Sequence, residues 1–179
     1  MRILLHVCCA PCSVKCTESL AAEGKTPVLY WFNPNIHPFT EYKNRRDALL
    51  LFAKIEGLEV ALDGESYGLR PFLNAVHDAF EARCDICYRL RLDAAARYAA
   101  ANGYDGFSTT LLISPYQQHE RLRALGEQAA NTHGVTFLYR DFRPLFRAGQ
   151  QMAKERGLYR QKYCGCIFSE EERYNRKDF

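Results

Sequence analysis

The sequence predicts a single α/β domain in which helices cover both faces of a parallel sheet. Short apolar runs alternate along the whole chain with longer amphipathic stretches, and this alternation is typical of strand–helix–strand units. The chain has 179 residues, and 47% of them are hydrophobic, which allows one compact domain with a sizeable core. Ligands bind such folds at the carboxyl ends of the strands. Residues that follow a strand are therefore the first candidates for a functional site.

The first half of the chain alternates three predicted strands with two predicted helices. The strands are apolar, β-branched or aromatic runs: RILLHV (2–7), PVLYWFN (27–33) and LEVAL (58–62). A helix over 13–24 ends near Gly24, and a helix over 39–56 presents an apolar face. The segment NPNIHP (33–38) is predicted as a loop because it holds two prolines and two asparagines.

The second half predicts two more strands among five helices. The strands are the apolar runs GFSTTLLI (106–113) and VTFLY (135–139). The helices follow from amphipathic or charged periodicity, at 69–80, 85–102, 117–132, 147–156 and 168–176. Glycine closes three of them, at Gly103, Gly134 and Gly157, because it adopts the left-handed conformation that a helix end favours.

Charge and composition exclude a membrane-spanning or secreted protein. No apolar run approaches ~18 residues, and the start MRILLHVCC lacks a cleavage site of small residues. We therefore expect a cytoplasmic protein that does not bind membranes. The net charge of +3 permits a nucleic-acid partner without demanding one. In a reducing compartment the eight cysteines are not expected to form disulfides, so they ligate metal, carry redox chemistry or fill the core.

The cysteines cluster in a way that core filling does not explain. They form three groups: C-C-x-x-C (Cys8, Cys9, Cys12) with Cys16 four residues on, CDIC (Cys84, Cys87) and CGC (Cys164, Cys166). A zinc site needs four ligands, and an iron–sulfur cluster takes three or four thiolates. Seven clustered cysteines exceed one tetrahedral ion, and their number matches one cluster plus one further metal ion.

The local geometry of two groups adds to this interpretation. Adjacent residues of an extended strand point in opposite directions, so Cys8 and Cys9 are expected to serve two neighbouring centres. The same argument applies less strictly to Cys164 and Cys166, because Gly165 lets the backbone bend. Cys87 lies near the start of a predicted helix, where the helix dipole favours a thiolate.

With these motifs in view, the chain resembles the cobalamin-independent epoxyqueuosine reductases, the QueH family. The resemblance is carried by LLHVCCAPCS, FNPNIHP followed by EYKNR, CDICYRLRL, STTLLISPYQ, DFR and YRQKYCGCIFS. These motifs extend from residue 4 to residue 169, so they cover essentially the whole chain.

The resemblance implies a fold and an activity. The fold would be Rossmann-like, as in the adenine-nucleotide α-hydrolases, with one metalloenzyme domain over 1–179 and a helical, cysteine-bearing extension from about residue 145. The activity would be the reduction of epoxyqueuosine to queuosine at the wobble position of tRNA, the last step of queuosine biosynthesis. A [4Fe–4S] cluster beside a second mononuclear metal ion, iron or zinc, would serve this reaction. A separate electron-donor protein would supply the electrons.

The resemblance also implies a set of metal ligands. We expect Cys9, Cys84, Cys87 and Cys164 to hold the cluster, and Cys8, Cys12 and Cys166 to hold the second metal. Some members of the family have aspartate where this chain has Cys12, which leaves the ligand set of the second metal less defined than its position. Cys16, one helical turn beyond Cys12, is expected to fill the core.

Further residues are candidates for contact with the substrate or the tRNA. His37 and Tyr116 are the candidate catalytic side chains, although His6 is expected to be a core histidine. The other candidates are Tyr42, Arg46, Arg89, Ser108, Thr109, Gln117, Arg160 and Lys162. A single-stranded RNA loop is recognised by cations and aromatic rings. We therefore expect Arg45 to contact phosphates as well, and Tyr159 and Tyr163 to offer stacking surfaces. The simpler alternatives are a solvated basic face and strand hydroxyls bonded within the core.

The expected chemistry requires both centres. Opening an epoxide to an alkene consumes two electrons and protons and releases the oxygen as water. A cluster relays electrons singly, and a metal with an open position binds the oxygen as a Lewis acid. No G-x-G-x-x-G motif follows a strand, so bound NAD or flavin is not expected. One alternative is an ATP-pyrophosphatase-like enzyme, although CCAPCS is not a phosphate loop. Another is a zinc or iron–sulfur module that only binds RNA or a partner.

Overall fold

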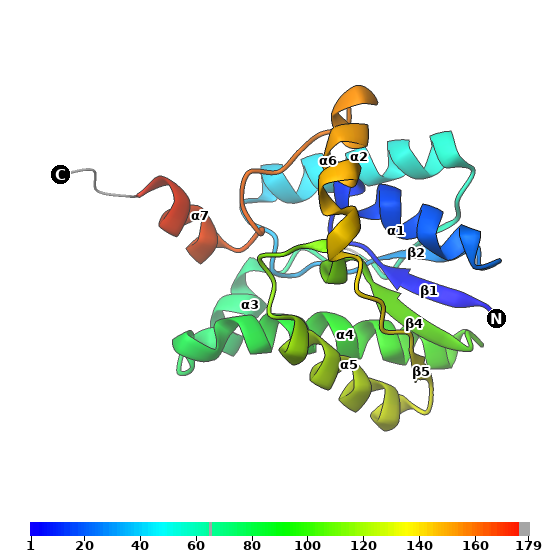
Figure 1. Cartoon of the computed structure of the whole chain (residues 1–179). Coiled ribbons are helices and arrows are strands. Elements are labelled where there is room, and N and C mark those ends of the chain that lie inside the picture. The colour runs from blue at the N-terminus through cyan, green and yellow to red at the C-terminus, as the bar shows by residue number, and fades with distance from the viewer. Residues whose placement is uncertain (65, 176–179) are drawn as a thin grey trace.

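The computed structural model describes residues 1–64 and 66–175, and its centre is a sheet of five parallel strands (Figure 1). The strands are β1 (Ile3–His6), β2 (Val28–Trp31), β3 (Val60–Leu62), β4 (Gly106–Thr109) and β5 (Thr136–Phe137). Their order across the sheet is β3-β2-β1-β4-β5. The predicted α/β fold, a parallel sheet flanked by helices in a single domain, is thereby confirmed.

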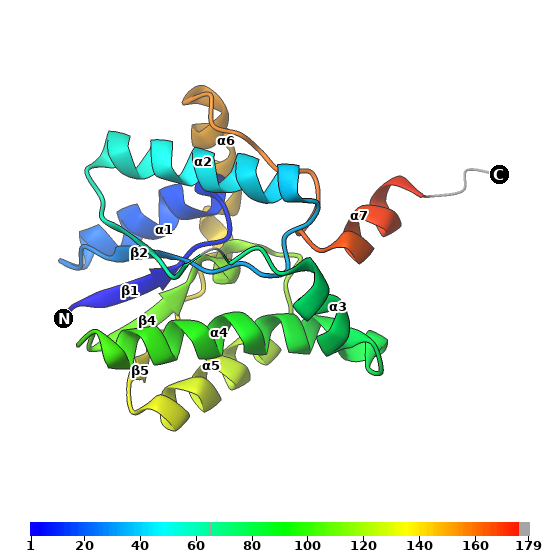
Figure 2. The ribbon, with the colours of Figure 1, turned by 180° about the vertical axis from the view of Figure 1, so that it is seen from behind.

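Helices cover both faces of this sheet. The helices are α1 (Ala10–Ala22), α2 (Phe39–Glu56), α3 (Leu69–Val76), α4 (Arg83–Ala101), α5 (His119–His133), α6 (Phe146–Glu155) and α7 (Ile167–Tyr174). Three short 3-10 helices are η1 (Phe80–Ala82), η2 (Thr110–Ile113) and η3 (Arg143–Leu145). One face is covered by α1, α2 and α6, and the other by α3, α4 and α5 (Figures 1 and 2). Within the described part of the chain, no helix combines the length and the apolar character that crossing a bilayer requires.

The core lies on both sides of the central strands. Leu4 and Leu5 of β1 and Phe107 of β4 are fully buried, as expected for a parallel sheet covered on both faces. Helix α4 contributes a run of buried alanines, 94–96, whose small side chains allow the helix to lie close to β1 and β4. His6, at the end of β1, has the place predicted for a core histidine, and burial lowers its pKa to about 4.

The chain direction across the sheet reverses between β1 and β4. From β1 the chain proceeds outward to β2 and β3, and from β4 it proceeds outward in the other direction to β5. Such a reversal leaves a crevice at the carboxyl ends of the two central strands, where ligands bind in open α/β sheets. The loop that follows β1 and the segment that follows β4 therefore meet at this edge.

Two of the element boundaries that differ from those predicted lie at this edge. Helix α1 begins at Ala10 rather than at 13, because Cys9 is extended (φ −173°, ψ 159°) and Pro11 occupies the first turn, where its missing N–H costs nothing. The run 106–113 is a strand only to Thr109 and then turns into η2, where the Thr109 hydroxyl accepts from the Leu111 N–H. The last helix was predicted to end at residue 176, which lies outside the described residues.

We expect the substitution Gly106→Ala to destabilise the fold. An added Cβ would lie 2.5 Å from the backbone oxygen of Thr136, so β5 would have to move away from β4. The free energy of unfolding should fall by about 1–3 kcal/mol, the usual cost of overpacking. In an open strand alanine would instead stabilise by about 0.5–1 kcal/mol. Chemical denaturation followed by circular dichroism measures this difference.

The matched control is Gly149→Ala in α6. The nearest atom to its added Cβ would be 3.4 Å away, which is an ordinary contact, so stability should stay the same or rise. A Gly106→Ala protein as stable as the Gly149→Ala protein would contradict the close approach of β5 to β4.

Candidate metal centre

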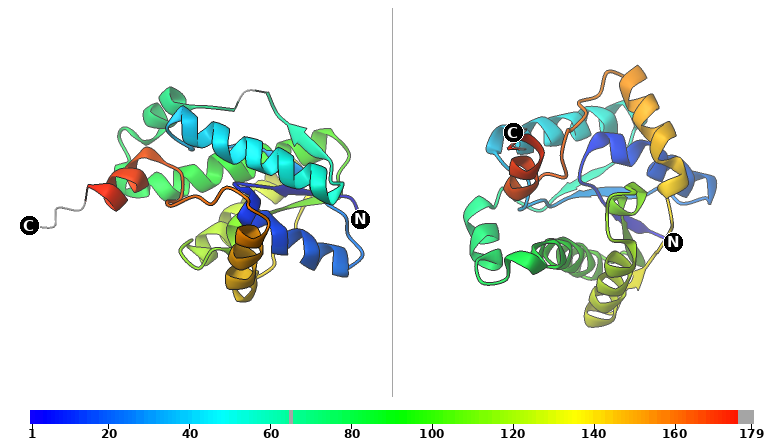
Figure 3. Two further views of the ribbon diagram at one scale, coloured as in Figure 1. Left: turned by 90° about the horizontal axis from the view of Figure 1, so that it is seen from above. Right: turned by 60° about the vertical axis from the view of Figure 1, so that its left-hand side comes forward.

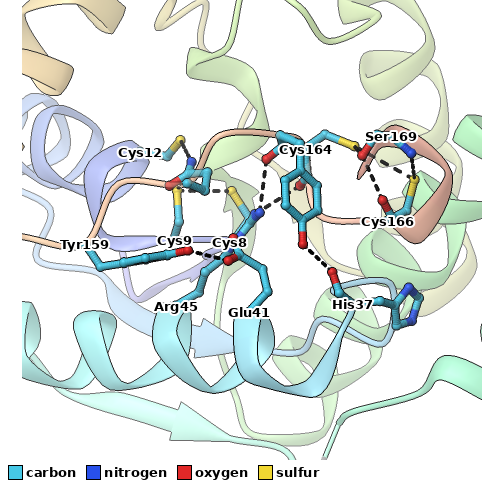
Figure 4. Close-up of polar contacts among 12 residues, drawn as sticks. Cys8, Cys9, Cys12, His37, Glu41, Arg45, Tyr159, Cys164, Cys166 and Ser169 are labelled. Carbon is cyan, nitrogen blue, oxygen red and sulfur yellow. Dashed lines mark hydrogen bonds and ion pairs between the residues drawn. The ribbon is translucent and has the colours of Figure 1, made fainter. Parts of the chain in front are cut away.

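Three cysteines meet in the loop between β1 and α1. The Sγ atoms of Cys8 and Cys9 are 3.8 Å apart, and all three Sγ atoms, including that of Cys12, lie within 4.8 Å of one another (Figure 4). All three residues are buried. Among the described residues this is the one group of three or more Cys, His or carboxylate side chains that are this close. Their spacing suits a metal ion with sulfur ligands.

The expectation that Cys8 and Cys9 diverge is therefore wrong. It assumed that both residues belong to the strand, but β1 ends at His6. Because α1 begins directly after Cys9, the side chain of Cys12 in its first turn points back toward the start of the helix, where Cys8 and Cys9 lie.

Four more cysteines gather at the start of α4 and in the segment before α7. A small cavity is lined by all four, Cys84, Cys87, Cys164 and Cys166. The Sγ atoms of Cys164 and Cys166 are 4.0 Å apart, across Gly165. Gly165 has φ +130°, a backbone conformation in which an L side chain would be strained, so glycine is required at this bend. Cys164 also borders a larger cavity together with Cys8 and Cys12, which makes the seven thiols one continuous region.

The eighth cysteine is separate from this region. Cys16 is fully buried in the main hydrophobic core, on α1 one turn beyond Cys12, and burial raises its pKa. This is the position expected of a core-filling residue.

Gln161 contacts the first cysteine group from the C-terminal segment. Its Nε2 donates to Cys9 Sγ at 2.8 Å and lies 3.8 Å from Cys12 Sγ, while its buried Oε1 has no hydrogen-bond partner. This contact was not predicted. The available signal was the position of Gln161 three residues before Cys164, but neutral amides are common on surfaces and carry little information by type alone.

Arg45 fastens the same segment to α2. Its side chain is 1% exposed, pairs with Glu41 Oε1 at 2.7 Å, and donates to the backbone oxygens of Tyr163 and Cys164, each at 3.0 Å (Figure 4). The hydroxyl of Tyr159 donates to the other oxygen of Glu41. Arg45 was grouped with the phosphate-binding residues, but it is consumed by these internal bonds. Tyr159 and Tyr163 likewise bond inward, Tyr163 to the backbone oxygen of His37.

A second buried arginine, Arg91, lies beside the other cysteine group. Its guanidinium NH2 is 3.1 Å from Cys87 Sγ, and its Nε donates to the backbone oxygen of Cys87 at 3.2 Å. Burial raises the pKa of the Cys87 thiol to about 11, against the opposing effect of the Arg91 charge. Burial therefore opposes a thiolate at this position, which needs further positive charge, as from a metal.

A cavity of about 420 Å³ opens beside the thiols. Cys8, Cys12 and Cys164 form part of its wall, and three residues predicted to contact substrate, Tyr116, Gln117 and Lys162, also line it. The Tyr116 ring is 83% exposed and meets Phe146 edge-on, with the ring centroids 5.9 Å apart. Gln117 accepts from the Tyr88 hydroxyl at 2.7 Å, which leaves its amide N–H groups available to a ligand.

The hydroxyls of Ser108 and Thr109 form hydrogen bonds within the core and do not face the cavity. Ser108 donates to the Leu138 backbone oxygen at 2.8 Å, and the Thr109 hydroxyl lies 2.9 Å from His6 Nδ1, both fully buried. Neither lines the cavity, because β4 ends here and the chain turns into η2. Thr110 reaches the site instead, where its hydroxyl accepts from the Cys8 N–H at 3.3 Å.

The predicted roles of the His37 and Tyr42 side chains are not supported, because both side chains point into the core. The His37 ring packs against Tyr67 and Phe72 and hydrogen bonds to the Pro34 backbone oxygen at 3.0 Å, pointing away from the cysteines (Figure 4). Burial lowers its pKa to about 4. The Tyr42 hydroxyl is 3.0 Å from both Trp31 Nε1 and Ser66 Oγ, so it bonds within the core rather than to RNA.

Three of the four arginines predicted to contact RNA, Arg46, Arg89 and Arg160, lie outside the cavity wall. Arg89 on α4 and Arg160 before the CGC motif are exposed. Arg46 on α2 is half-buried, stacks over Tyr42 and pairs weakly with Asp47 at 3.4 Å. Arg89 and Arg160 are therefore surface cations, two residues after Cys87 and four residues before Cys164 respectively.

A family model and several relatives match this chain over almost its whole length. A family model described as epoxyqueuosine reductase QueH matches residues 3–172. The chain is 38% identical over 175 residues to an epoxyqueuosine reductase QueH of Dehalococcoides mccartyi, covering 98% of this chain and 96% of that protein. It is 34% identical over 179 residues to an epoxyqueuosine reductase QueH of Thermotoga maritima, covering 96% of this chain and 91% of that one.

One solved structure shares the fold. It is a predicted subunit of a tRNA methyltransferase from Methanocaldococcus jannaschii, with a TM-score of 0.52 and 14% sequence identity. The match covers 89% of this chain and 91% of that one. At this identity the likeness concerns the fold alone.

We expect Arg45→Lys to loosen the segment that carries the CGC motif. Lysine keeps the charge opposite Glu41 but cannot form the paired bonds to the two backbone oxygens. Loss of charged hydrogen bonds costs about 1.5–3 kcal/mol, so amide exchange over residues 158–166 should accelerate roughly ten- to hundredfold. Hydrogen–deuterium exchange with mass spectrometry measures this.

Arg123→Lys is the matched control, because Arg123 is exposed and pairs with Glu127 on its own helix. Equal exchange over 158–166 in both variants would show that Arg45 does not hold the segment.

Proposed function

The chain belongs to the QueH family of epoxyqueuosine reductases, and we propose that it reduces epoxyqueuosine to queuosine at the wobble position of tRNA. The observation that carries this proposal is the convergence of seven of its eight cysteines on one region beside an open cavity, while Cys16 lies fully buried one turn further along α1. Thiols concentrated at the switch point of an α/β sheet suit redox and metal chemistry at a substrate site.

The residues present fit a cluster and a neighbouring metal ion. We propose that Cys9, Cys84, Cys87 and Cys164 hold a [4Fe–4S] cluster, and that Cys8, Cys12 and Cys166 hold a second metal, iron or zinc. Support comes from the seven thiols, which lie in one region without a disulfide, five of them buried, with Cys84 half-buried and Cys164 exposed. It also comes from the buried Arg91, whose guanidinium contacts the Cys87 sulfur. When bound, these groups would supply single electrons and a Lewis-acidic position for an oxygen.

Proximity suggests a different division of the same cysteines. Cys8, Cys9 and Cys12 lie together, and the other four line the small cavity. Both divisions place the centres side by side, because Cys164 borders both cavities. They differ in which of Cys9 and Cys166 serves the four-iron cluster and which serves the second metal, and single variants distinguish them.

The side chains around the cavity orient the substrate and move protons. The reaction takes two electrons from a separate donor protein and two protons, breaks both epoxide C–O bonds and forms an alkene and water. We propose that the Tyr116 hydroxyl, in the wall of the cavity, delivers a proton. The Lys162 ammonium would hold the leaving oxygen, and the free N–H of Gln117 would fix the cyclopentene portion. His37 would hold the segment that carries the CGC motif, because its backbone N–H donates to the Gly165 oxygen and its backbone oxygen accepts from the Tyr163 hydroxyl.

The tRNA would approach over the mouth of the cavity. A nucleoside in a single-stranded loop can be turned out of its stack and held between aromatic rings, and exposed Tyr116 offers such a ring. Arg89 and Arg160, with Arg46 further along α2, would contact phosphates. Acting on tRNA, the protein would work in the cytoplasm. The segment from about residue 145 would form a C-terminal extension that brings Gln161, Lys162 and the CGC motif over the site.

We expect protein purified anaerobically to be brown, with about four sulfides per chain and metal beyond the cluster iron. Its visible absorbance should bleach with dithionite, and it should convert epoxyqueuosine in tRNA to queuosine. Metal and sulfide assays with nucleoside mass spectrometry measure both. Protein that is colourless and binds only zinc after anaerobic reconstitution, without turnover, would contradict the proposal and favour an RNA-binding zinc module.

Single cysteine variants separate the two divisions. In the division proposed above, Cys9→Ser loses the sulfide, while Cys8→Ser and Cys12→Ser keep it and lose only the second metal. Cys16→Ser is the matched control, adjacent in sequence but outside the site, and should keep both centres and turnover. A Cys9→Ser protein that retains four sulfides would overturn this division in favour of the one that proximity suggests.

A further inference from the structure

One buried charge at the site has no conventional partner. Arg91 lies on α4, four residues after Cys87, and is only 3% exposed. This spacing places both side chains on one face of the helix, so the guanidinium returns to the Cys87 sulfur at 3.1 Å. Arg89, two residues earlier in the same motif, is on the outside.

Comparison with the other buried arginine shows what Arg91 lacks. Arg45 pairs with the carboxylate of Glu41 at 2.7 Å. Over residues 1–64 and 66–175, Arg91 forms no ion pair with an aspartate or glutamate. Its guanidinium contacts the Cys87 sulfur, and it lines the small cavity together with Cys84, Cys164 and Cys166. A guanidinium stays charged in proteins, and a buried charge without a counter-ion is strongly disfavoured. The balancing negative charge must therefore come from sulfur.

We propose that Arg91 is the counter-charge of the iron–sulfur site, a positioning residue that raises the reduction potential of the cluster through Cys87. This inference rests on the proposed function, because it requires a cluster at the site. Reduction adds one negative charge to a cluster that is already anionic. A buried cation and an N–H···S bond both stabilise the added electron, because little water is present to screen them.

The same residue would also favour loading of the site. Bringing several thiolates together is opposed by their mutual repulsion, and a fixed cation beside Cys87 reduces that repulsion. Lys162 and Arg173, which line the large cavity, reach the region from the surface, where water screens their charges. Arg91 is buried and cannot be replaced by solvent cations.

The test is a redox titration of the reconstituted protein with three variants. Arg91→Gln removes the charge and keeps a donor, Arg91→Lys keeps the charge and loses the planar fork, and Arg97→Gln removes an exposed charge from the same helix. Iron and sulfide are assayed first, and the potential is then followed by visible absorbance and electron paramagnetic resonance.

We expect Arg91→Gln to lower the equilibrium constant for reduction at least tenfold, which is 59 mV for a one-electron couple. Arg91→Lys should stay within about threefold of the unmodified protein, and Arg97→Gln should be unchanged. Failure of Arg91→Gln to load iron and sulfide, when Arg91→Lys loads both, would also support the counter-charge. If Arg91→Gln does not fold, the test rests on Arg91→Lys. A tenfold drop in its equilibrium constant for reduction overturns the proposal, and a constant within threefold of the unmodified protein supports it.

Other results overturn the inference. A cluster in Arg91→Gln with an unchanged potential overturns the role of Arg91 alone, and turnover of epoxyqueuosine then leaves the proposed function standing. An equal shift of the reduction potential in Arg97→Gln would show that the potential depends only on the net charge of the protein, and it would overturn the inference too. Unmodified protein that forms no cluster overturns both proposals together.

Discussion

The carboxyl ends of β1 and β4 lie side by side because the strand order reverses between them, and the rest of the site depends on this adjacency. In a parallel sheet every strand ends at the same edge, and the following helix begins there. The start of α1 brings Cys9 and Cys12 to this edge, and the start of α4 brings Cys84 and Cys87. Cysteines almost 80 positions apart in the chain thereby meet without any long connection of their own. The order of the strands thus explains why the first and second cysteine groups can form one region.

A region this rich in buried sulfur needs positive charge to be stable in its ionised form. Burial is the largest cause that raises the pKa of the Cys87 thiol, to about 11, and it also raises the pKa of Cys84, which opposes a thiolate at neutral pH. The protein places two buried arginines against the region, and among the described residues Glu41 is the only buried carboxylate. This imbalance of one charge is unusual in a core, where charges are paired. Anionic sulfur in the interior would balance this excess positive charge. It would also explain why the arginine side chains are buried.

Sequence patterns predicted the fold and the membership of the cysteine region better than its geometry. Helix α2 begins and ends where its periodicity predicts, because Pro38 precedes it and Gly57 closes it. The five strands follow from their apolar runs. The directions of the Cys8 and Cys9 side chains were missed because they depend on where α1 begins, and a helix boundary that differs by three residues reverses that conclusion. Ser108, Thr109 and Tyr42 look like surface ligands by type, but their hydrogen-bond partners lie far away in the chain. Gln161 and Arg91 were missed for the same reason: a contact with sulfur leaves no periodic signal.

The segment 159–166 links the first cysteine group, the large cavity and the second cysteine group. Its Gln161 contacts Cys9, its Lys162 lines the cavity, and its Cys164 and Cys166 complete the second cysteine group. The segment has no helix or strand, and it crosses from α6 to α7 along α2 (Figure 3). Its position therefore rests on side-chain bonds, chiefly those of Arg45 to two backbone oxygens, and on the bond from the His37 N–H to the Gly165 oxygen at 2.8 Å. Because proposed metal ligands and part of the cavity wall share this one segment, the arrangement of the thiols and the shape of the cavity cannot vary independently. A change that moves the segment must alter both, which distinguishes this site from one in which the metal-binding and substrate-binding residues lie on separate rigid elements.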